Sequence, residues 1–168
     1  MGYYVTALTR DAESNRTLLM NMGAHKVLSC TEFFENTKNN GPLATEMYVG
    51  VIDTIGNSYL PKMMSNLHRG GIAVSCGCLA GDRIEEISLI SFVRRGIRLC
   101  GCDSRYLELN ERTKIWDRLN QDLASNEEFF ENDDLFSEIN FSQVQALASK
   151  KLMGGTIGLA VTVNVRSE

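Results

Sequence analysis

The 168-residue chain has 43% hydrophobic and 23% charged residues, enough apolar side chains to fill the core of one domain. Its formal net charge is −4 and its lysines and arginines are scattered, which argues against a nucleic-acid-binding surface. No apolar run approaches the ~20 residues of a membrane helix. We therefore expect a cytoplasmic protein, folded as one domain over residues 1–168, with neither nucleic acid nor a membrane as partner.

The five cysteines raise the question of a metal site. They stand at positions 30, 76, 78, 100 and 102, and the last four form two Cys-x-Cys pairs in apolar segments. Zinc-binding cysteines are usually two to four residues apart in loops, whereas alternation by two inside a strand puts both thiols on one face of a sheet. We therefore expect buried, reduced thiols and no metal. An odd number of cysteines also argues against a disulfide framework.

The first predicted elements alternate between strand and helix. A β-branched and aromatic run predicts a buried strand over residues 3–9, and a helix over 13–22 follows, which Gly23 ends. A short strand is predicted over residues 26–29. Residues 30–46 are polar and contain Asn-Asn-Gly-Pro, so we predict a loop there with one helical turn at its phenylalanine pair.

The middle of the chain is dominated by apolar strands. Residues 47–53 form a continuous apolar run, which is typical of a strand buried on both faces of a parallel sheet. Ser58 can cap the next helix, and Pro61 is tolerated because it lies in the first turn. We expect this helix to end near His68 and the following strand to cover residues 72–76.

The remaining elements continue the alternation. A strand is predicted over residues 97–102, an amphipathic helix over 110–124, a solvated acidic loop over 127–134, a helix around 142–151 and a strand over 157–165. Strands that alternate with helices of this length indicate an α/β fold with a Rossmann-like, doubly wound parallel sheet.

The place of the first strand is informative. Thr9 and Arg10 follow it where a Rossmann unit reads the adenosine ribose, yet only Met1-Gly2 precede it. We therefore expect this chain to lack the usual first strand, with its glycine-rich turn and helix. Because that strand is central in the 3-2-1-4-5-6 order, we expect the gap to be closed by a rearranged strand order or by a segment of another copy.

The residues after the first strand bear on the choice of cofactor. A strand that recognises NAD usually ends in Asp or Glu, whereas NADP requires small polar and cationic residues. Arg10, together with Arg16 on the following helix, can pair with a 2′-phosphate through charge-assisted hydrogen bonds. The alternative is that both are solvated arginines at the start of a helix.

The other strand ends fit a cofactor crevice, because ligands of open α/β sheets lie beyond the carboxyl ends of the strands. These ends read DTIG at residues 53–56, CGC at 76–78 and CDS at 102–104. No catalytic set accompanies them, since His25 and His68 lie near helix ends, where surface or capping roles are the commoner ones. The chemistry is therefore expected to come from a bound cofactor or from residues outside this chain.

Three stretches of the sequence carry a family resemblance: GYYVTALTR at residues 2–10 followed by LLMNMGA at 18–24, the run at 51–77, and the run at 92–119. They contain DT-hydrophobic-G, RG-hydrophobic-x-L-x-G-x-DS and a helix with a tryptophan. Together they resemble the zinc-independent quinone oxidoreductases of the medium-chain dehydrogenase/reductase superfamily, with the acryloyl-CoA reductase branch nearest.

The resemblance implies two domains that bind different ligands, and a set of site residues. In this family a GroES-like N-terminal barrel binds the substrate, and a C-terminal Rossmann domain binds NADPH, which gives a hydride to an activated alkene. The implied cofactor-binding residues are Thr9 and Arg10 at the 2′-phosphate, Ile55, Gly77 and Cys78 along the cleft, and Cys102 and Ser104 at the nicotinamide carboxamide. The family's closing Gly-Arg reads Gly158-Leu159 here.

We therefore expect residues 1–168 to be a partial NADP-binding Rossmann domain without the GroES-like domain. It would be the cofactor-binding portion of an NADPH-dependent quinone oxidoreductase or enoyl-thioester reductase. By itself it is expected to be inactive, with no catalytic residue and with NADPH binding weakened or lost. The alternative is a non-catalytic Rossmann-like module for oligomer formation or partner binding.

The strand over residues 97–102 is expected to lie at a sheet edge. An unpaired apolar edge is an aggregation liability, and pairing with its own copy across a two-fold axis satisfies the backbone groups. We therefore expect a homodimer in which this pairing hides Ile97 and Leu99.

Overall fold

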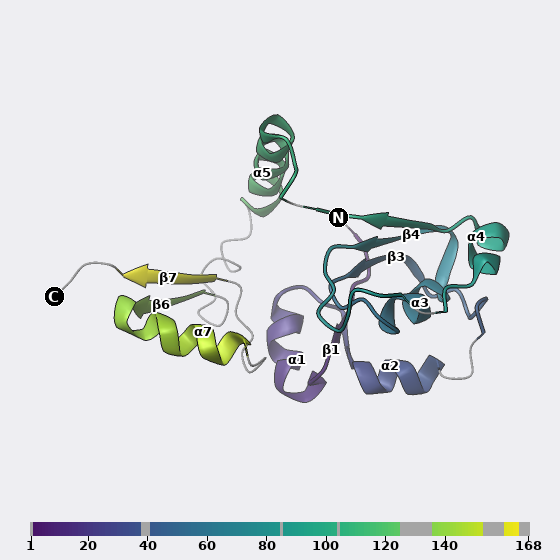
Figure 1. Cartoon of the computed structure of the whole chain (residues 1–168), viewed down its shortest axis with the longest axis horizontal. Coiled ribbons are helices and arrows are strands. Elements are labelled where there is room, and N and C mark those ends of the chain that lie inside the picture. Colours follow the sequence, from purple (N-terminus) through teal and green to yellow (C-terminus); the bar gives the residue numbers. More distant parts are fainter. Residues whose placement is uncertain are drawn as a thin grey trace. The chain divides into compact units, whose positions relative to one another are not determined.

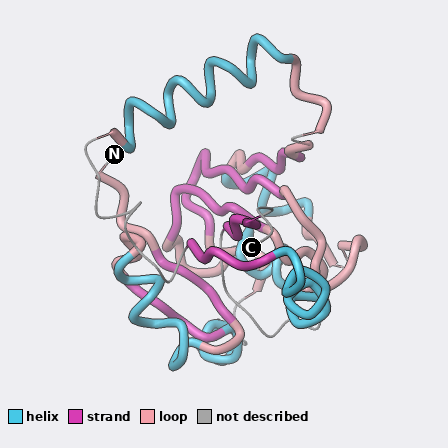
Figure 2. The backbone as a smooth tube through the Cα atoms, turned by 90° about the vertical axis from the view of Figure 1, so that its left-hand side faces the viewer, coloured by secondary structure: helices cyan, strands magenta, loops and turns pink. Residues whose placement is uncertain are grey.

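The structure is a computed structural model, and it describes residues 2–37, 41–84, 86–103, 105–124, 136–152 and 160–164. The chain divides into two compact units, Met1–Leu109 and Asn110–Glu168, each of which is described by itself. Strands alternate with helices in the first unit (Figures 1 and 2), and every strand pair is parallel. The predicted α/β fold with parallel, Rossmann-like strands is confirmed.

The first sheet consists of β1 (Thr6–Thr9) and β2 (Lys26–Ser29), joined by α1 (Ala12–Asn21). Asp11 caps α1, because its carboxylate accepts the N–H of Ser14 at 3.0 Å. The predicted burial from Tyr3 onwards is wrong, since residues 3–5 are exposed. Val5 bonds to His25 and Lys26, and the ring of Tyr4 packs on His25, but these partners are themselves exposed, so residues 3–5 stay at the surface.

Residues that the sequence predicts as a loop with one helical turn at Phe33 and Phe34 form the longer helix α2 (Cys30–Thr37). The prediction is wrong because a capping box starts the helix: Ser29 Oγ accepts the N–H of Glu32 at 3.0 Å, and the Glu32 carboxylate accepts the N–H of Ser29 at 2.7 Å. Phe33 is buried on the inner face of this helix. The local start signal outweighs the polar composition of the segment.

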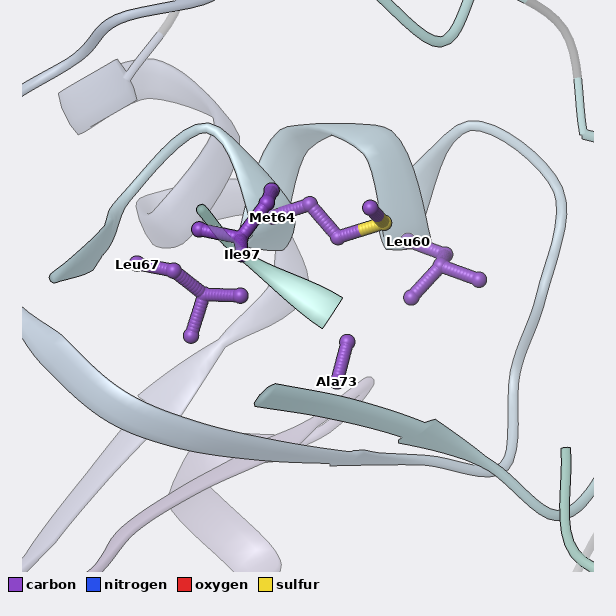
Figure 3. Packing of buried hydrophobic residues seen from close by; sticks show 5 residues of the cluster. All are labelled: Leu60, Met64, Leu67, Ala73 and Ile97. Atoms are coloured by element: carbon purple, nitrogen blue, oxygen red, sulfur yellow. The ribbon is translucent and has the colours of Figure 1, made fainter. Parts of the chain in front are cut away.

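The second sheet has the order β3-β4-β5, from β3 (Tyr48–Asp53), β4 (Leu67–Ser75) and β5 (Arg98–Gly101). Helices α3 (Tyr59–Met64) and α4 (Leu89–Arg95) make the crossovers. Figure 3 shows the core between helix and sheet, built from Leu60, Met64, Leu67, Ala73 and Ile97. Strand β5 pairs only with β4 among the described residues, so its predicted edge position is confirmed.

Helix α3 ends at Met64 rather than near His68, which lies in β4. The buried Asn66 explains the early end, because its amide donates to the Lys62 carbonyl at 2.9 Å and closes the last turn. Ser58 makes no side-chain cap bond to this helix.

No helix is predicted at α4, although both of its ends carry signals. Ser88 accepts the N–H of Ile90, and Gly96 ends the helix at φ 60°.

The sequence predicts that β3 is buried on both faces, and this is wrong. Val49 is 61% exposed and Ile52 is 81% exposed. In the described part of the first unit, α3 and α4 pack on the face that carries Val51, Ala73 and Leu99. Ile52 lies on the opposite face, where no helix of this unit's described residues covers it.

The predicted burial of the cysteine pairs is also wrong, because the thiols at positions 76, 78, 100 and 102 are exposed and only Cys30 is buried. The reason is their place at the carboxyl ends and on the uncovered face of the second sheet. Among the described residues no three His, Cys, Asp or Glu side chains are grouped so as to hold a metal ion.

The strands of the first unit keep the neighbours that a Rossmann sheet predicts. The order β2-β1 corresponds to strands 3-2 of the 3-2-1-4-5-6 order, and β3-β4-β5 corresponds to strands 4-5-6. No described strand lies between β1 and β3. The expected rearrangement of the strand order is therefore wrong, because each crossover returns its strand to the expected neighbour. Closure by a segment of another copy stays a prediction.

The second unit contains α5 (Leu109–Leu123), β6 (Phe136–Asn140), a 3-10 turn over Phe141–Gln143, α7 (Val144–Leu152) and β7 (Ala160–Asn164). Strand β6 is not predicted by the sequence, and it pairs in parallel with β7. The apolar stripe of α5 is exposed at Trp116. The acidic loop over residues 127–134 and Gly158-Leu159 lie outside the described residues. Nowhere in the described chain does a helix have the length and apolar character to cross a membrane.

Candidate cofactor site

Two turns interlock at the carboxyl ends of β3 and β4. The buried carboxylate of Asp53 accepts the N–H of Ile55 at 3.0 Å and the N–H of Gly56 at 3.1 Å, which shapes the first turn. The carbonyl of Ile55 in turn accepts the N–H of Ala80 at 2.8 Å. Gly56 also forms an isolated bridge with Gly81. The first turn therefore sets the position of the second.

Two glycines make this approach of the turns possible. A Cβ on Gly77 would lie 2.8 Å from the Thr54 carbonyl oxygen. A Cβ on Gly56 would lie 2.6 Å from the Gly81 oxygen, and the φ of Gly56 is +72°. Glycine at both positions is therefore required by backbone packing. This packing leaves Cys78, in the second turn, exposed.

The end of β5 joins the same edge of the sheet. The N–H of Cys102 donates to the carbonyl of Ser75 at 2.9 Å, which places Cys102 beside the end of β4. The structure thus brings four of the predicted site residues together at one sheet edge: Ile55, Gly77, Cys78 and Cys102. Ser104 lies outside the described residues.

Thr9 and Arg10 lie at the end of β1, in the other sheet of the first unit. Thr9 Oγ1 accepts the side-chain N–H of Asn15 at 3.0 Å. Arg10 lines an open hollow with Arg16, whose Nη1 donates to the Val27 carbonyl at 3.3 Å. The end of β1 and the first turns of α1 therefore carry the hydroxyl of Thr9 and the guanidinium groups of Arg10 and Arg16.

The charges around this hollow are mixed. Asp11 and Glu32 line it too, and hydrogen bonds from the Ser14 N–H and the Ser29 N–H respectively hold the pKa of each carboxyl below its usual value. Burial raises the pKa of the neighbouring Cys30 thiol, and the positive charge of Arg10 opposes that rise. The lowered pKa keeps both carboxylates negatively charged, and the guanidinium groups of Arg10 and Arg16 are the cationic donors of this hollow.

The two histidines have structural partners away from these strand ends. His25 Nδ1 accepts the N–H of Val5 at 3.1 Å, and His68 Nδ1 lies 3.2 Å from a Glu46 oxygen. Neither residue lines the edge formed by the ends of β3, β4 and β5. The described part of the site therefore contains strand-end turns and guanidinium groups but no histidine base.

The sequence places Asp53 at a strand end of the crevice but gives its side chain no role, and it does not predict Asn57 or Asn15 as part of the site. Asn57 has a φ of 52° and donates its side-chain N–H to the Ala80 carbonyl at 3.0 Å, which links the two turns. The signal for Asp53 is an Asp at a strand end followed by Gly three residues later, a pattern typical of a side chain that bonds turn amides. No local signal marks Asn15.

The comparisons with known proteins cover almost the whole chain. It is 32% identical over 161 residues to the protein described as probable acrylyl-CoA reductase AcuI of Escherichia coli, a match that spans 94% of this chain and 47% of the relative. The chain therefore belongs to the quinone oxidoreductase and acrylyl-CoA reductase family of the medium-chain dehydrogenase/reductase superfamily. It corresponds to the C-terminal portion of its family members.

A second relative and a solved structure agree with this assignment. Acrylyl-CoA reductase AcuI of Ruegeria pomeroyi is 30% identical over 123 residues, 73% of this chain and 36% of that relative. The YhdH oxidoreductase of Salmonella enterica, solved in complex with NADP, superposes with a TM-score of 0.84 at 27% identity, over 98% of this chain and 48% of that one. No protein-family model matches the sequence. The chain spans less than half the length of these reductases.

Proposed function

We propose that the chain is the cofactor-binding portion of an NADPH-dependent reductase whose substrate is an activated alkene, either an enoyl thioester of the acrylyl-CoA kind or a quinone. The observation that carries the proposal is the match across 94% of the chain to an acrylyl-CoA reductase relative. The site geometry supports it, because the ends of β3, β4 and β5 form one edge where an open α/β sheet binds its ligand.

The donor set at the end of β1 fits the phosphate that distinguishes NADPH from NADH. Arg10 supplies a guanidinium whose charge-assisted hydrogen bonds suit a 2′-phosphate. Thr9 offers a hydroxyl held by Asn15. An acidic residue, which would favour the 2′-hydroxyl of NADH, does not stand at the last position of this strand.

The remaining predicted residues are proposed to bind the cofactor beyond its adenosine end. The turns that contain Ile55, Gly77 and Cys78 supply a wall of backbone at the ends of β3 and β4. Cys102 is proposed to lie at the nicotinamide end, as Ser104 is. When bound, NADPH supplies the hydride, and this chain's own residues bind and orient it.

The binding of adenosine nucleotides tests this proposal. We expect adenosine 2′,5′-bisphosphate to shift the backbone NMR signals of residues 9–12, and 5′-AMP to shift them less. Arg10→Ala is expected to weaken the bisphosphate roughly ten- to a hundred-fold, the equivalent of ~1.5–3 kcal/mol for a charge-assisted bond. Arg118→Ala, which removes an exposed guanidinium from α5, is the control.

Equal affinities for wild type and Arg10→Ala would mean that Arg10 is only a solvated residue at the start of α1. A chain that responds to neither nucleotide nor to NADPH would favour the alternative function, a non-catalytic module for oligomer formation or partner binding. The activity is proposed for the whole reductase. We expect the purified 168-residue chain to oxidise no NADPH with acrylyl-CoA or a quinone, because correct placement of substrate and cofactor supplies most of the rate.

A dimer through the free edge of β5 is also proposed. The prediction that this pairing hides Ile97 and Leu99 is wrong: Ile97 is 4% exposed and Leu99 packs against the same core, so a partner strand is not needed to cover them. What supports the dimer is the outer edge of β5, which pairs with no other described strand and whose backbone groups another copy can pair. A cytoplasmic location stays a prediction.

A further inference from the structure

Asp53 is the charged residue with the lowest exposure among those described, at 1%. Its side chain serves the backbone of its own turn and the next strand. Oδ1 accepts the amide N–H groups of Ile55 and Gly56, and Oδ2 accepts the Gly56 N–H at 3.2 Å and the Ser75 hydroxyl at 3.3 Å. A buried carboxylate is costly unless such donors surround it.

The turn that Asp53 holds contains backbone that does not adopt its shape cheaply. Gly56 has a φ of +72°, and the next residue, Asn57, has a φ of 52°, which is uncommon for any residue other than glycine. The amides that bond to Asp53 belong to Ile55, which precedes this pair, and to Gly56, its first member. These hydrogen bonds offset the free-energy cost of the turn's unfavourable backbone conformation.

The shape of this turn is passed to its neighbour. The carbonyl of Thr54 accepts the Leu79 N–H at 3.2 Å, and that of Ile55 accepts the Ala80 N–H at 2.8 Å. Asn57 adds its side-chain bond to the Ala80 carbonyl. The positions of Ile55, Gly77 and Cys78, which the proposed function places along the cofactor, therefore depend on one buried carboxylate.

We propose that Asp53 is a positioning residue for the cofactor beyond its adenosine end, an inference that rests on the proposed NADPH binding. Its carboxylate holds the turn at residues 54–57, and this turn positions the one at residues 77–81. Both turns then line one side of the proposed cofactor site. Asp53 itself does not touch the cofactor. The adenosine end, which Thr9 and Arg10 bind, lies in the other sheet and does not depend on Asp53.

Two ligands separate positioning from a general role in folding. NADPH engages both ends of the proposed site, whereas adenosine 2′,5′-bisphosphate engages only the end at Arg10. We expect Asp53→Ala to weaken NADPH at least ten-fold in an NMR titration and to change the affinity for the bisphosphate less than two-fold. Asp53→Asn keeps an acceptor for the two amides and is expected to retain most of the NADPH affinity.

Two further variants complete the test. Ser75→Ala removes the hydroxyl that lies 3.3 Å from Asp53 Oδ2 and 3.4 Å from the Gly77 carbonyl oxygen, and it leaves the turn amides bonded to Asp53, so it should retain most of the NADPH affinity. Asn57→Gly removes the link to Ala80 while it tolerates the positive φ, so it should fold well and weaken NADPH by a smaller factor. If Asp53→Ala does not fold, Asn57→Gly still tests whether the link between the two turns positions NADPH.

Each outcome has a distinct meaning. Equal NADPH affinity in wild type, Asp53→Ala and Asn57→Gly would overturn the inference, and so would an equal loss of both ligands in Asp53→Ala. A wild-type chain that binds the bisphosphate but not NADPH would overturn the role of Asp53 and leave the site at Arg10 standing. A wild-type chain that binds neither ligand would overturn the proposed function itself.

Discussion

Arg95 Nε lies 3.4 Å from a carboxylate oxygen of Glu46, and this contact ties helix α4 to the segment before β3. The guanidinium is buried and also donates to three backbone carbonyls: Ser65 at 2.8 Å, Leu67 at 3.1 Å, and Ala44. One side chain thus satisfies carbonyls from the end of α3, the start of β4 and the loop between residues 41 and 47. Arg95 therefore holds together the segments that lead into β3 and β4.

Replacement of Arg95 by Met should destabilise the first unit strongly. Methionine fills the space but donates no hydrogen bond, so buried carbonyls lose their partner, at a cost of about 3 kcal/mol in the free energy of unfolding. Urea unfolding measures the change. Arg94→Met, one residue earlier and exposed, is the control and should change stability by less than ~0.5 kcal/mol. Similar values for the two variants would show that the carbonyls find other donors.

Stability should fall in acid partly through Glu46. The N–H of Arg69, and then the charges of Arg95 and His68, hold the pKa of Glu46 below its usual value of 4.5. A carboxyl with a lowered folded-state pKa stabilises the protein above its unfolded-state pKa, and this contribution is lost as the pH falls through the folded-state value. The difference in stability between wild type and Glu46→Gln should therefore shrink as the pH falls below about 4.5. A difference that does not change with pH would contradict this.

Gly77→Ala should destabilise the strand-end turns. The added Cβ would lie 2.8 Å from the Thr54 oxygen and 3.1 Å from the Thr54 Cα, so backbone must move, at a cost of about 1–3 kcal/mol. Gly101→Ala is the control, because a Cβ there meets no atom within 4 Å. Thermal unfolding of the two variants checks the prediction. Equal melting temperatures would mean that the two turns separate easily.

A charge on the edge strand should disrupt the proposed dimer. Cys100 lies in β5 and is exposed, so Cys100→Glu alters no core contact but sets like charges against each other across a two-fold axis. Light scattering should then give the monomer mass. Cys76→Glu, an exposed thiol just beyond β4, serves as control and should remain dimeric. A wild-type monomer would mean that the proposed dimer does not form. A dimer that both variants keep would place the interface elsewhere.

Much of the local structure could be predicted because its signals lie close together in the sequence. The strand over Lys26–Ser29 and the helix before Gly23 follow from periodicity and capping within a few residues. Ser29 and Glu32 carry the local signal for the start of helix α2, whereas the polar composition of residues 30–46 favours a loop. The family resemblance likewise depends on short motifs that can be recognised without coordinates.

The sequence by itself determined the strands of the first unit, the parallel α/β class and the chemistry available at the strand ends, but not α2, α4 or β6. Only the tertiary structure decided which side chains are exposed and which distant residues contact each other. Ile52 and Cys100 are exposed because the described helices of their unit cover the other face of the sheet, which no local pattern records. Asp53 meets Ser75 across 22 positions because parallel strands bring their carboxyl ends together after a crossover, and that juxtaposition exists only in the folded chain.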